Sequence, residues 1–530
     1  MNPLIQLNRQ LQYLFIALLL ACFAIMQSAI AVTPEPDGGY PNGNTAEEDN
    51  ALLDLNTGTP TPTSSFPLKK SANGRYLIYQ DGTPFFLLGD SAWYLPVQGT
   101  NADIDTYLAD RAAKGFNTVL VQIIDNHYAD KAPNNIDGVA PFTTPGNFST
   151  ANPAYFTRID YILTQANNRG MLVIVFPLFL GYNCGSDGWA KQVLADTTPH
   201  IQQYAQFLGN RYKNFGNIIW VMGGDTDVTC ASGLAAKVDA FATALVAADP
   251  NHLVTSHNNG NEAVTPWLPT VPSWLNLNNV YGPSPLTFTQ GQTAYNRTPT
   301  RPFFLIESYY ENDGHGLTRK QLRNQEYWAL LSGCAGFMFG NCPMWGAGSA
   351  VTHTKCPSVS ADWRLHLNSP GAQDITRLKN LFTAVTWQTL VPDFTHTTVT
   401  AGYGSGATTV TTSRASDGSF VISYLPTVSG ITVNMSKLTG KSVAARWYDP
   451  SDDVYSTVSG SPFTNTGTHV FTPTGNNSSG GSDWLLLLQS TSVPTATPTP
   501  PSLTATPPTE TPPPGATETP DADKERLSRS

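Results

Sequence analysis

The chain has 530 residues, more than one ordinary domain needs, so we expect two folded units with flanking tails. Hydrophobic residues make up 40% of the chain, enough for a large core. Charged residues make up only 13%, and the formal net charge is -10. Nucleic-acid binding is therefore not expected, because neutralising phosphates needs a basic face.

The N-terminal segment predicts export. Arg9 is the only charge before an apolar run from Leu11 to Met26, and the small-residue pattern Ala29-Ile30-Ala31 follows it. This order is typical of a signal peptide cleaved after Ala31. The alternatives are an uncleaved membrane anchor and lipidation at Cys22. No later stretch of the sequence is apolar and long enough to span a bilayer, so we expect no membrane span in the mature chain.

Composition divides the rest of the chain into four parts. Residues 32–65 and 491–530 are rich in Pro and Thr and predict extended, disordered segments. Residues 66–391 alternate strand-like and helix-like patterns. Residues 392–490 are rich in Thr, Ser, Gly and Val with period-two alternation, which predicts a β-sandwich domain. We favour packing against the first domain over ligand binding as its role.

Eight strand-like runs alternate with helix-like segments across residues 66–391. The predicted strands are 85–90, 116–124, 171–177, 217–222, 252–256, 275–281, 302–306 and 335–339. The predicted helices are 103–114, 153–168, 200–213, 233–248, 318–331 and 374–384. This spacing predicts an α/β fold of the (β/α)8 TIM-barrel type. The alternative, a doubly wound open sheet, lacks a Gly-rich phosphate turn after its first strand.

Five cysteines remain after the predicted cleavage. Cys342 and Cys356 flank one loop and are the expected pair, and Cys184 and Cys230 would pair if the loops after two successive strands meet. Cys334 lies in an apolar stretch and is expected to be unpaired. No cysteine or histidine spacing resembles a metal site, so we expect no metal and no cofactor.

Two acids occupy the positions where barrel enzymes place catalytic residues. Asp225 ends the fourth predicted strand and Glu307 the seventh, so both carboxylates would reach the mouth of the barrel. Glycoside hydrolysis needs such a pair, one to protonate the departing oxygen and one to attack the anomeric carbon or activate water. The alternative is that each caps a helix or pairs with a lysine. Asp227 is the rival for the acid role.

Further polar and aromatic residues lie near the same strand ends. Aromatic rings offer faces for sugar C–H groups, and polar side chains bind hydroxyls. The predicted substrate-binding residues are Asp90, Trp93, Gln122, His257, Tyr281 and Trp345. For Asp90 a salt bridge at the barrel rim is an equal alternative. Other aromatics expected at this rim are Tyr128, Tyr182, Trp189, Tyr309 and Tyr310.

Four segments in chain order resemble the apiosidase-like glycoside hydrolases. They are Leu88-Gly89-Asp90-Ser91-Ala92-Trp93, Gly115-Phe116-Asn117-Thr118-Val119, Trp220-Val221-Met222-Gly223-Gly224-Asp225 and Leu305-Ile306-Glu307. The segment Ala445-Arg446-Trp447-Tyr448-Asp449-Pro450 resembles the small β domain that usually follows, a domain labelled as collagen-binding. The resemblance implies β-apiosidase-type activity on pectin side chains by a retaining mechanism, with Asp225 as acid/base and Glu307 as nucleophile. At the end of the fourth strand, the wider clan of retaining barrel enzymes usually has Asn-Glu, whereas this chain has Gly224-Asp225.

Three functions remain open at this point. The first is a secreted, exo-acting glycosidase with a carbohydrate substrate, acting as a monomer. The second is an endo-acting polysaccharide hydrolase with an open groove. The third is a carbohydrate- or matrix-binding protein whose barrel has lost activity, and the presence of both acids argues against it.

Overall fold

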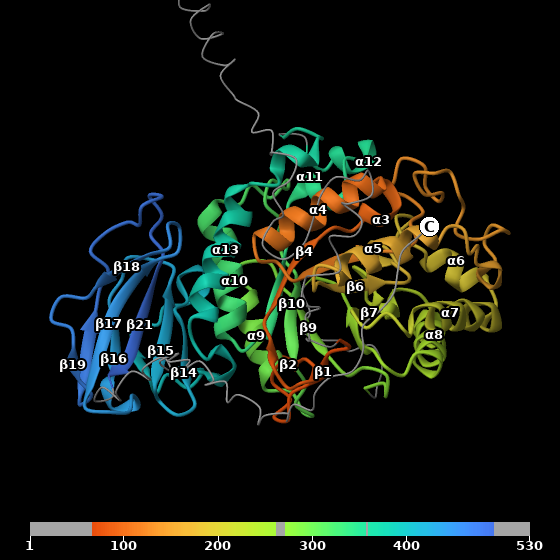
Figure 1. Cartoon of the computed structure of the whole chain (residues 1–530). Helices are drawn as coiled ribbons and strands as arrows, with labels where there is room; N and C mark the ends of the chain where they lie inside the picture. Colours follow the sequence, from red (N-terminus) through yellow and green to blue (C-terminus); the bar gives the residue numbers. More distant parts are fainter. Residues whose placement is uncertain (1–65, 261–270, 357–358, 492–530) are drawn as a thin grey trace, which may run out of the picture. The chain divides into compact units, whose positions relative to one another are not determined.

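The computed structural model describes residues 66–260, 271–356 and 359–491 (Figure 1). The predicted signal peptide, the segment 32–65 and the tail after residue 491 lie outside these ranges. Among the helices of the described ranges, none has the length and apolar character needed to cross a bilayer.

The first domain is a parallel sheet of eight strands whose spatial order follows the chain. The strands are β4 (Leu87–Ser91), β5 (Thr118–Gln122), β6 (Leu172–Phe176), β7 (Ile218–Gly223), β8 (Leu253–His257), β9 (Asn278–Tyr281), β10 (Phe303–Glu307) and β11 (Gly336–Phe339). β11 pairs with β4, and the main-chain N–H groups of Asn276 and Leu277 donate to the Val254 carbonyl between β8 and β9. These contacts close the sheet into the predicted barrel.

Helices cover the outside of this barrel (Figure 1). The longer ones are α4 (Asn101–Ala113), α5 (Thr157–Asn167), α7 (Thr198–Tyr212), α8 (Leu234–Ala248), α9 (Thr287–Tyr295), α10 (Arg319–Leu331) and α13 (Pro370–Thr383). Short helices lie in the connections: α3 (Leu95–Gln98), α6 (Ala190–Ala195), α11 (Cys342–Trp345) and α12 (Ala350–His353). Thr100 and Thr318 cap the starts of α4 and α10 with capping boxes. Helix α9 was not predicted, because its polar sequence with Gly291 lacks an apolar stripe.

The barrel strands are buried on both faces, which explains their continuous apolar runs. In β6, Leu172 and Ile174 face the barrel interior, whereas Val173 and Val175 pack under the helices. A small antiparallel sheet of β1 (Lys69–Lys70), β2 (Leu77–Ile78) and β3 (Pro84–Phe85) precedes β4. The first predicted strand is therefore split, with Phe85 in β3 and the barrel strand beginning at Leu87.

The second domain, called the β domain below, is a sandwich of two antiparallel sheets. The larger sheet contains β12 (Leu390–Pro392), β14 (Thr411–Ala415), β15 (Phe420–Leu425), β21 (Trp484–Thr491), β17 (Ser442–Asp449) and β18 (Val454–Thr457), with β19 (Phe463–Thr464) also paired to β17. The smaller sheet contains β13 (Val399–Ala401), β16 (Ile431–Asn434) and β20 (Thr468–Phe471).

The central strands of the larger sheet of the β domain are buried on both faces. Leu486 and Leu488 of β21 pack in the sandwich core, whereas Leu485 and Leu487 join the core that includes the barrel helices. The sheet therefore packs against the barrel, in line with the role that we favour for this domain.

A buried cation joins the two domains. Arg323 of α10 is 1% exposed, and its guanidinium lies 2.8 Å from the Asp483 carboxylate of the β domain and 2.9 Å from the Asp374 carboxylate of α13. Both acids are also buried. Removing one partner of such a buried cluster leaves charge without compensation.

We expect Arg323→Ala to lower the free energy of unfolding by about 3–5 kcal/mol, because Asp374 and Asp483 lose a buried counter-charge. Urea denaturation followed by fluorescence measures the loss. The matched control is Arg364→Ala, which removes an arginine whose side chain is 49% exposed and paired with Asp103 and Asp362. The control should cost about 1 kcal/mol or less. Equal losses in the two variants would contradict a dominant role for the buried cluster.

Candidate functional site

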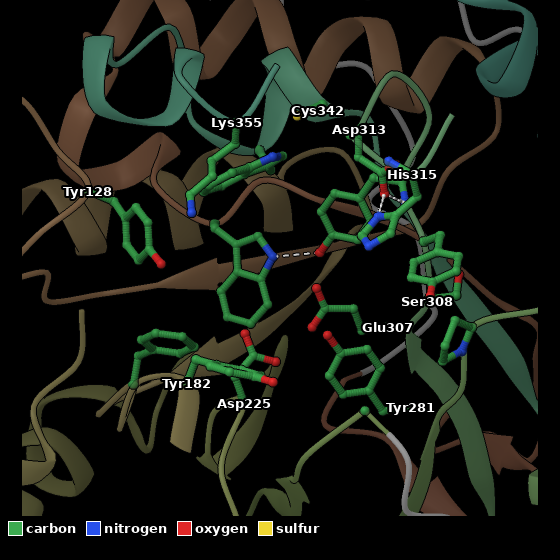
Figure 2. Close-up of a pocket in the computed structure, with 18 of the residues that line it drawn as sticks. Tyr128, Tyr182, Asp225, Tyr281, Glu307, Ser308, Asp313, His315, Cys342 and Lys355 are labelled. Atoms are coloured by element: carbon green, nitrogen blue, oxygen red, sulfur yellow. Dashed lines mark hydrogen bonds and ion pairs between the residues drawn. The ribbon is translucent and has the colours of Figure 1, made fainter. Parts of the chain in front are cut away.

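A cavity of about 660 Å³ opens at the carboxyl ends of the barrel strands. Asp225 and Glu307 both line it, together with Trp93, Tyr281 and Trp345. Figure 2 shows the two carboxylates directed into the same space, with the Tyr281 hydroxyl beside them. The structure thus brings together the two acids predicted from separate strands.

A sharp turn after β7 aims Asp225 into the cavity. Gly223, Gly224 and Asp225 have φ angles of 98°, 122° and 50°, all in the region that favours glycine. A Cβ atom on Gly224 would lie 2.4 Å from the ring of Phe179, so only glycine fits there. Asp225 is a non-glycine residue with a strained backbone, which is a common feature of functional sites.

A β-bulge aims Glu307. In β10, Phe303 and Leu305 face the helices, and strict alternation would send Glu307 in the same direction. The pairing with β9 shifts register between Leu305 and Glu307, and this shift turns the Glu307 side chain into the cavity.

The two carboxylates are close together and mostly shielded from solvent, since Asp225 is half-buried and Glu307 is 9% exposed. One oxygen of Asp225, one oxygen of Glu307 and one ring nitrogen of His257 lie within 4.8 Å of one another. Burial and the negative charge of Glu307 raise the pKa of Asp225 well above the ordinary Asp value. Burial also raises the pKa of Glu307, and the hydrogen bond from Tyr310 opposes this rise. The pair therefore keeps one proton far above the pH at which isolated carboxylates lose theirs.

Tyr310 is the hydrogen-bond donor to Glu307, and the hydrogen bond between Trp93 and Tyr310 fixes this direction. The indole N–H of Trp93 donates to the Tyr310 hydroxyl oxygen over 2.7 Å. Because an indole N–H can only donate, Tyr310 accepts this bond, and its own proton remains available for the hydrogen bond with Glu307. This donor stabilises the ionised form of Glu307.

His257 lies behind both acids with a defined tautomer. Its Nδ1 accepts a hydrogen bond of 3.0 Å from the main-chain N–H of Asp225, so the ring proton is on Nε2. Nε2 lies 2.8 Å from Glu307 Oε2, without the alignment of a full hydrogen bond. Burial lowers the pKa of His257 to about 4, so the ring is neutral. In this tautomer the Nδ1 lone pair accepts the Asp225 N–H and Nε2 carries the proton, so neither nitrogen has a lone pair free for a metal ion.

The other predicted substrate-binding residues fall into two groups. Trp93, Tyr281 and Trp345 line the cavity, and the Tyr281 hydroxyl is hydrogen-bonded to Asp225. Asp90 and Gln122 are fully buried and do not line it. They belong to the packing of the strand ends.

Asp90 and Gln122 each have protein partners. Asp90 faces helix α4, where its carboxylate accepts a hydrogen bond from Tyr107 and lies 2.6 Å from the guanidinium of Arg111. The salt bridge considered for Asp90 is thus the interaction that is present. Gln122 donates to the carbonyl of Ile124 over 2.6 Å. Direct contact of either residue with a substrate stays a prediction.

Two other sequence expectations are resolved. Asp227, the rival acid, accepts a hydrogen bond from the Thr229 N–H and does not line the cavity. Trp189 was expected at the rim but is 4% exposed and packs on Phe142 and Phe148, so that expectation was wrong. An aromatic residue in a loop is as easily used for packing as for binding.

The two expected disulfides tie down loops at the cavity. Cys184 and Cys230 join the loops after β6 and β7, and Cys342 and Cys356 join the segments beside α11 and α12. Cys334 is buried and free, as expected. The Cys184–Cys230 bond is two residues from Tyr182, which lines the cavity with 62% of its surface exposed.

Sequence reasoning missed several lining residues, among them Asp313, His315 and Lys355. Figure 2 shows Lys355 extending toward the cavity. One signal was available for it, because Lys355 precedes a cysteine whose expected partner, Cys342, directly follows the last barrel strand. Asp313 and His315 lie in a loop with no such marker, and there His315 stacks on Tyr309 with ring centroids 3.9 Å apart.

Solved structures resemble this chain over both domains. A protein named as a glycoside hydrolase is 25% identical, with a TM-score of 0.67, 82% of this chain covered and 98% of the other. A glycoside hydrolase family 5 protein from Bacteroides vulgatus is 23% identical, with a TM-score of 0.68 and coverages of 80% and 93%. The second similarity concerns the fold alone. No curated protein matches the chain.

Two family models match in succession. Residues 391–489 match a model described as "putative collagen-binding domain of a collagenase". Residues 71–389 match the model described as "Apiosidase-like, catalytic domain", which covers more than half of the chain and includes both cavity acids. The order of the two matches agrees with the predicted layout. The chain therefore belongs to the apiosidase-like family and is a glycoside hydrolase.

Proposed function

We propose that this glycoside hydrolase releases a sugar from pectin side chains, with β-apiosidase-like specificity and a retaining mechanism. Asp225 is the acid/base and Glu307 the nucleophile. The observation that carries the proposal is the approach of the two carboxylates within 4.8 Å in the cavity. Retaining enzymes hold their carboxyl groups about 5–5.5 Å apart, whereas inverting enzymes separate them by about 6.5–9.5 Å to admit a water.

The first step forms a glycosyl-enzyme. A Glu307 carboxylate oxygen attacks the anomeric carbon while the bond from that carbon to the departing oxygen breaks. Asp225 gives its proton to the departing oxygen, so the leaving group departs as a neutral alcohol. Desolvation and the charge of ionised Glu307 both raise the pKa of Asp225, which favours the protonated form that this step needs.

The second step hydrolyses this intermediate. Asp225, now ionised, takes a proton from a water that attacks the anomeric carbon, and the Glu307 carboxylate is released. Two attacks from opposite faces restore the original anomeric configuration. The hydrogen bond from Tyr310 favours Glu307 as the anion of the pair.

The size and the charge of the cavity suit a small substrate that carries an acidic group. Its volume of about 660 Å³ is within the range of about 300–1,000 Å³ that takes small ligands, which favours exo action. Trp345 and the exposed ring of Tyr182 offer faces for sugar rings. Lys355 is exposed and brings a positive charge to the cavity, which suits the carboxylate of a uronic acid in a pectic aglycone.

Export is part of the proposal. The bonds Cys184–Cys230 and Cys342–Cys356 support an oxidising compartment outside the cytoplasm. The signal peptide ending at Ala31 and the monomeric state are proposed on the sequence alone.

Replacing Glu307 and replacing Asp225 should both reduce hydrolysis, but the losses should depend differently on the leaving group of the substrate. We expect Glu307→Gln to lower kcat by at least about 10⁴-fold on every glycoside, because no covalent intermediate forms. Asp225→Ala should lose about 10²–10⁴-fold on natural linkages but far less on aryl glycosides, whose leaving groups need little protonation. Steady-state kinetics on pectic fragments and 4-nitrophenyl glycosides measures both. Equal losses of the Asp225 variant on the two substrate classes would argue against an acid role.

The pH profile of kcat/KM should be bell-shaped, with its acid limb set by protonation of Glu307 and its alkaline limb by ionisation of Asp225. Because Tyr310 donates to ionised Glu307, Tyr310→Phe should raise the pKa of Glu307 and move the acid limb to higher pH by about one unit or more. Tyr309→Phe, which changes a neighbouring ring that also lines the cavity, is the control and should leave the limb in place. An unmoved limb in Tyr310→Phe would refute the donor role.

Lys355→Gln should raise KM about five- to tenfold for fragments with a uronic acid next to the cleaved bond. The physical reason is the loss of one charge-assisted contact. An uncharged 4-nitrophenyl glycoside should be cleaved as before. Lys441→Gln, which changes an exposed lysine of the β domain, is the matched control. Equal effects on charged and uncharged substrates would exclude recognition of the carboxylate by Lys355.

A further inference from the structure

We propose that Gln325 is a positioning residue of this active site, and that its side-chain amide holds together the two loops that follow β9 and β10. This inference rests on the catalytic roles proposed above for Asp225 and Glu307. Gln325 lies in α10, is 2% exposed and does not line the cavity, so it acts through its neighbours rather than on substrate.

The Gln325 amide pairs with the main chain of the loop after β10. Its Oε1 accepts a hydrogen bond of 3.2 Å from the Tyr309 N–H, and its Nε2 donates one of 3.1 Å to the Tyr309 carbonyl. The main-chain N–H and the carbonyl of Tyr309 are thus both hydrogen-bonded to the Gln325 side chain. Tyr309 is two residues after Glu307 and one before Tyr310, so the backbone of this loop is set at the point that orients the Tyr310 ring.

The same amide oxygen also reaches the loop after β9. Oε1 accepts a hydrogen bond of 3.3 Å from the Ser284 N–H, three residues after Tyr281. One oxygen atom therefore joins two loops from neighbouring barrel strands. If Gln325 only filled space between the loops, its side chain would not need a hydrogen-bond acceptor at this point.

Each of the two loops is next to a tyrosine that is hydrogen-bonded to one of the carboxylates. The loop after β9 begins directly after Tyr281, and the loop after β10 contains Tyr310. The Tyr310 hydroxyl is bonded to Glu307, and the Tyr281 hydroxyl is bonded to Asp225. The ionisable groups that face Glu307 are Asp225 of the β7 turn, His257 of β8 and these two tyrosines. A change in the spacing of the two loops alters two of these four partners together.

The helix that carries Gln325 is anchored on the side of the β domain. Its Asn324 accepts a hydrogen bond from Tyr424, and its Trp328 indole donates to the Thr409 carbonyl over 2.8 Å. Arg323 adds the buried contact with Asp483 described above. Gln325 is thus placed on a rigid support, which is what a positioning residue requires.

The test compares Gln325→Met with Gln290→Met in the full-length protein. Gln290, on α9, is also buried and next to these loops, but its side-chain nitrogen and oxygen make no hydrogen bond within the described residues. The readouts are the pH profile of kcat/KM on the 4-nitrophenyl glycoside cleaved fastest, and the titration of the Glu307 carboxyl by ¹³C NMR.

In Gln325→Met we expect kcat to fall about ten- to hundredfold with little change in KM, because the reacting groups are displaced but the cavity remains. The acid limb and the ¹³C titration of Glu307 should both move to higher pH by about half a unit to one unit, because Tyr310 donates less well. Gln290→Met should leave the titration and the limb unchanged. A Gln325→Met protein with the wild-type titration of Glu307 would overturn the proposal, whatever its kcat.

Gln325→Glu gives a second, independent test that does not depend on the packing of methionine. When protonated, a glutamic acid has one donor and one acceptor, as this site requires, and when ionised it cannot donate to the Tyr309 carbonyl. We expect activity relative to wild type to recover toward acid pH, and a constant ratio across pH would contradict the positioning role. If wild type itself cleaves no glycoside, the proposed function fails, while the NMR titration still decides the role of Gln325.

Discussion

The organising constraint of this molecule is that two largely shielded carboxylates lie within 4.8 Å of each other. Ionising both would place two like charges at this distance, which is unfavourable, so the pair keeps one proton when solvent-exposed acids have lost theirs. The surrounding donors then decide where that proton resides. Trp93 directs the Tyr310 proton to Glu307, and the Asp225 main chain fixes the tautomer that places the His257 proton on Nε2, 2.8 Å from Glu307 Oε2. These contacts support the proposed roles, with Glu307 as the anion and Asp225 as the acid.

Local backbone features bring the acids together, and the closed sheet supports them. Asp225 reaches the cavity through a left-handed turn after two glycines, and Glu307 reaches it through a bulge in β10. Both features are at the end of a strand. The β domain continues this support outward, because its larger sheet and Arg323 anchor α10. The barrel and the β domain therefore form one packed unit rather than a catalyst with a tethered module.

Much of the fold was predictable because buried parallel strands are continuous apolar runs and their helices have amphipathic patterns. The positions of Asp225 and Glu307 followed from the rule that barrel enzymes use strand ends. The direction of each side chain did not follow, because alternation alone would turn Glu307 toward the helices, and no local pattern marks the bulge. Asp90 also lies near the end of a barrel strand, but it pairs with Arg111. The sequence alone does not predict that these two residues meet. Gln325 and Lys355 were missed because their roles depend on loops that meet only in three dimensions.

The strand β21 (Trp484–Thr491) has a consequence for how the protein assembles. It is a central strand, paired with both β15 and β17, and its leucines contribute to the cores on both of its faces. During synthesis, about 480 residues emerge before this strand does, so β15 and β17 must wait for the strand that joins them. Until β21 pairs with them, β15 and β17 present open strand edges, and open edges are prone to pair with other chains.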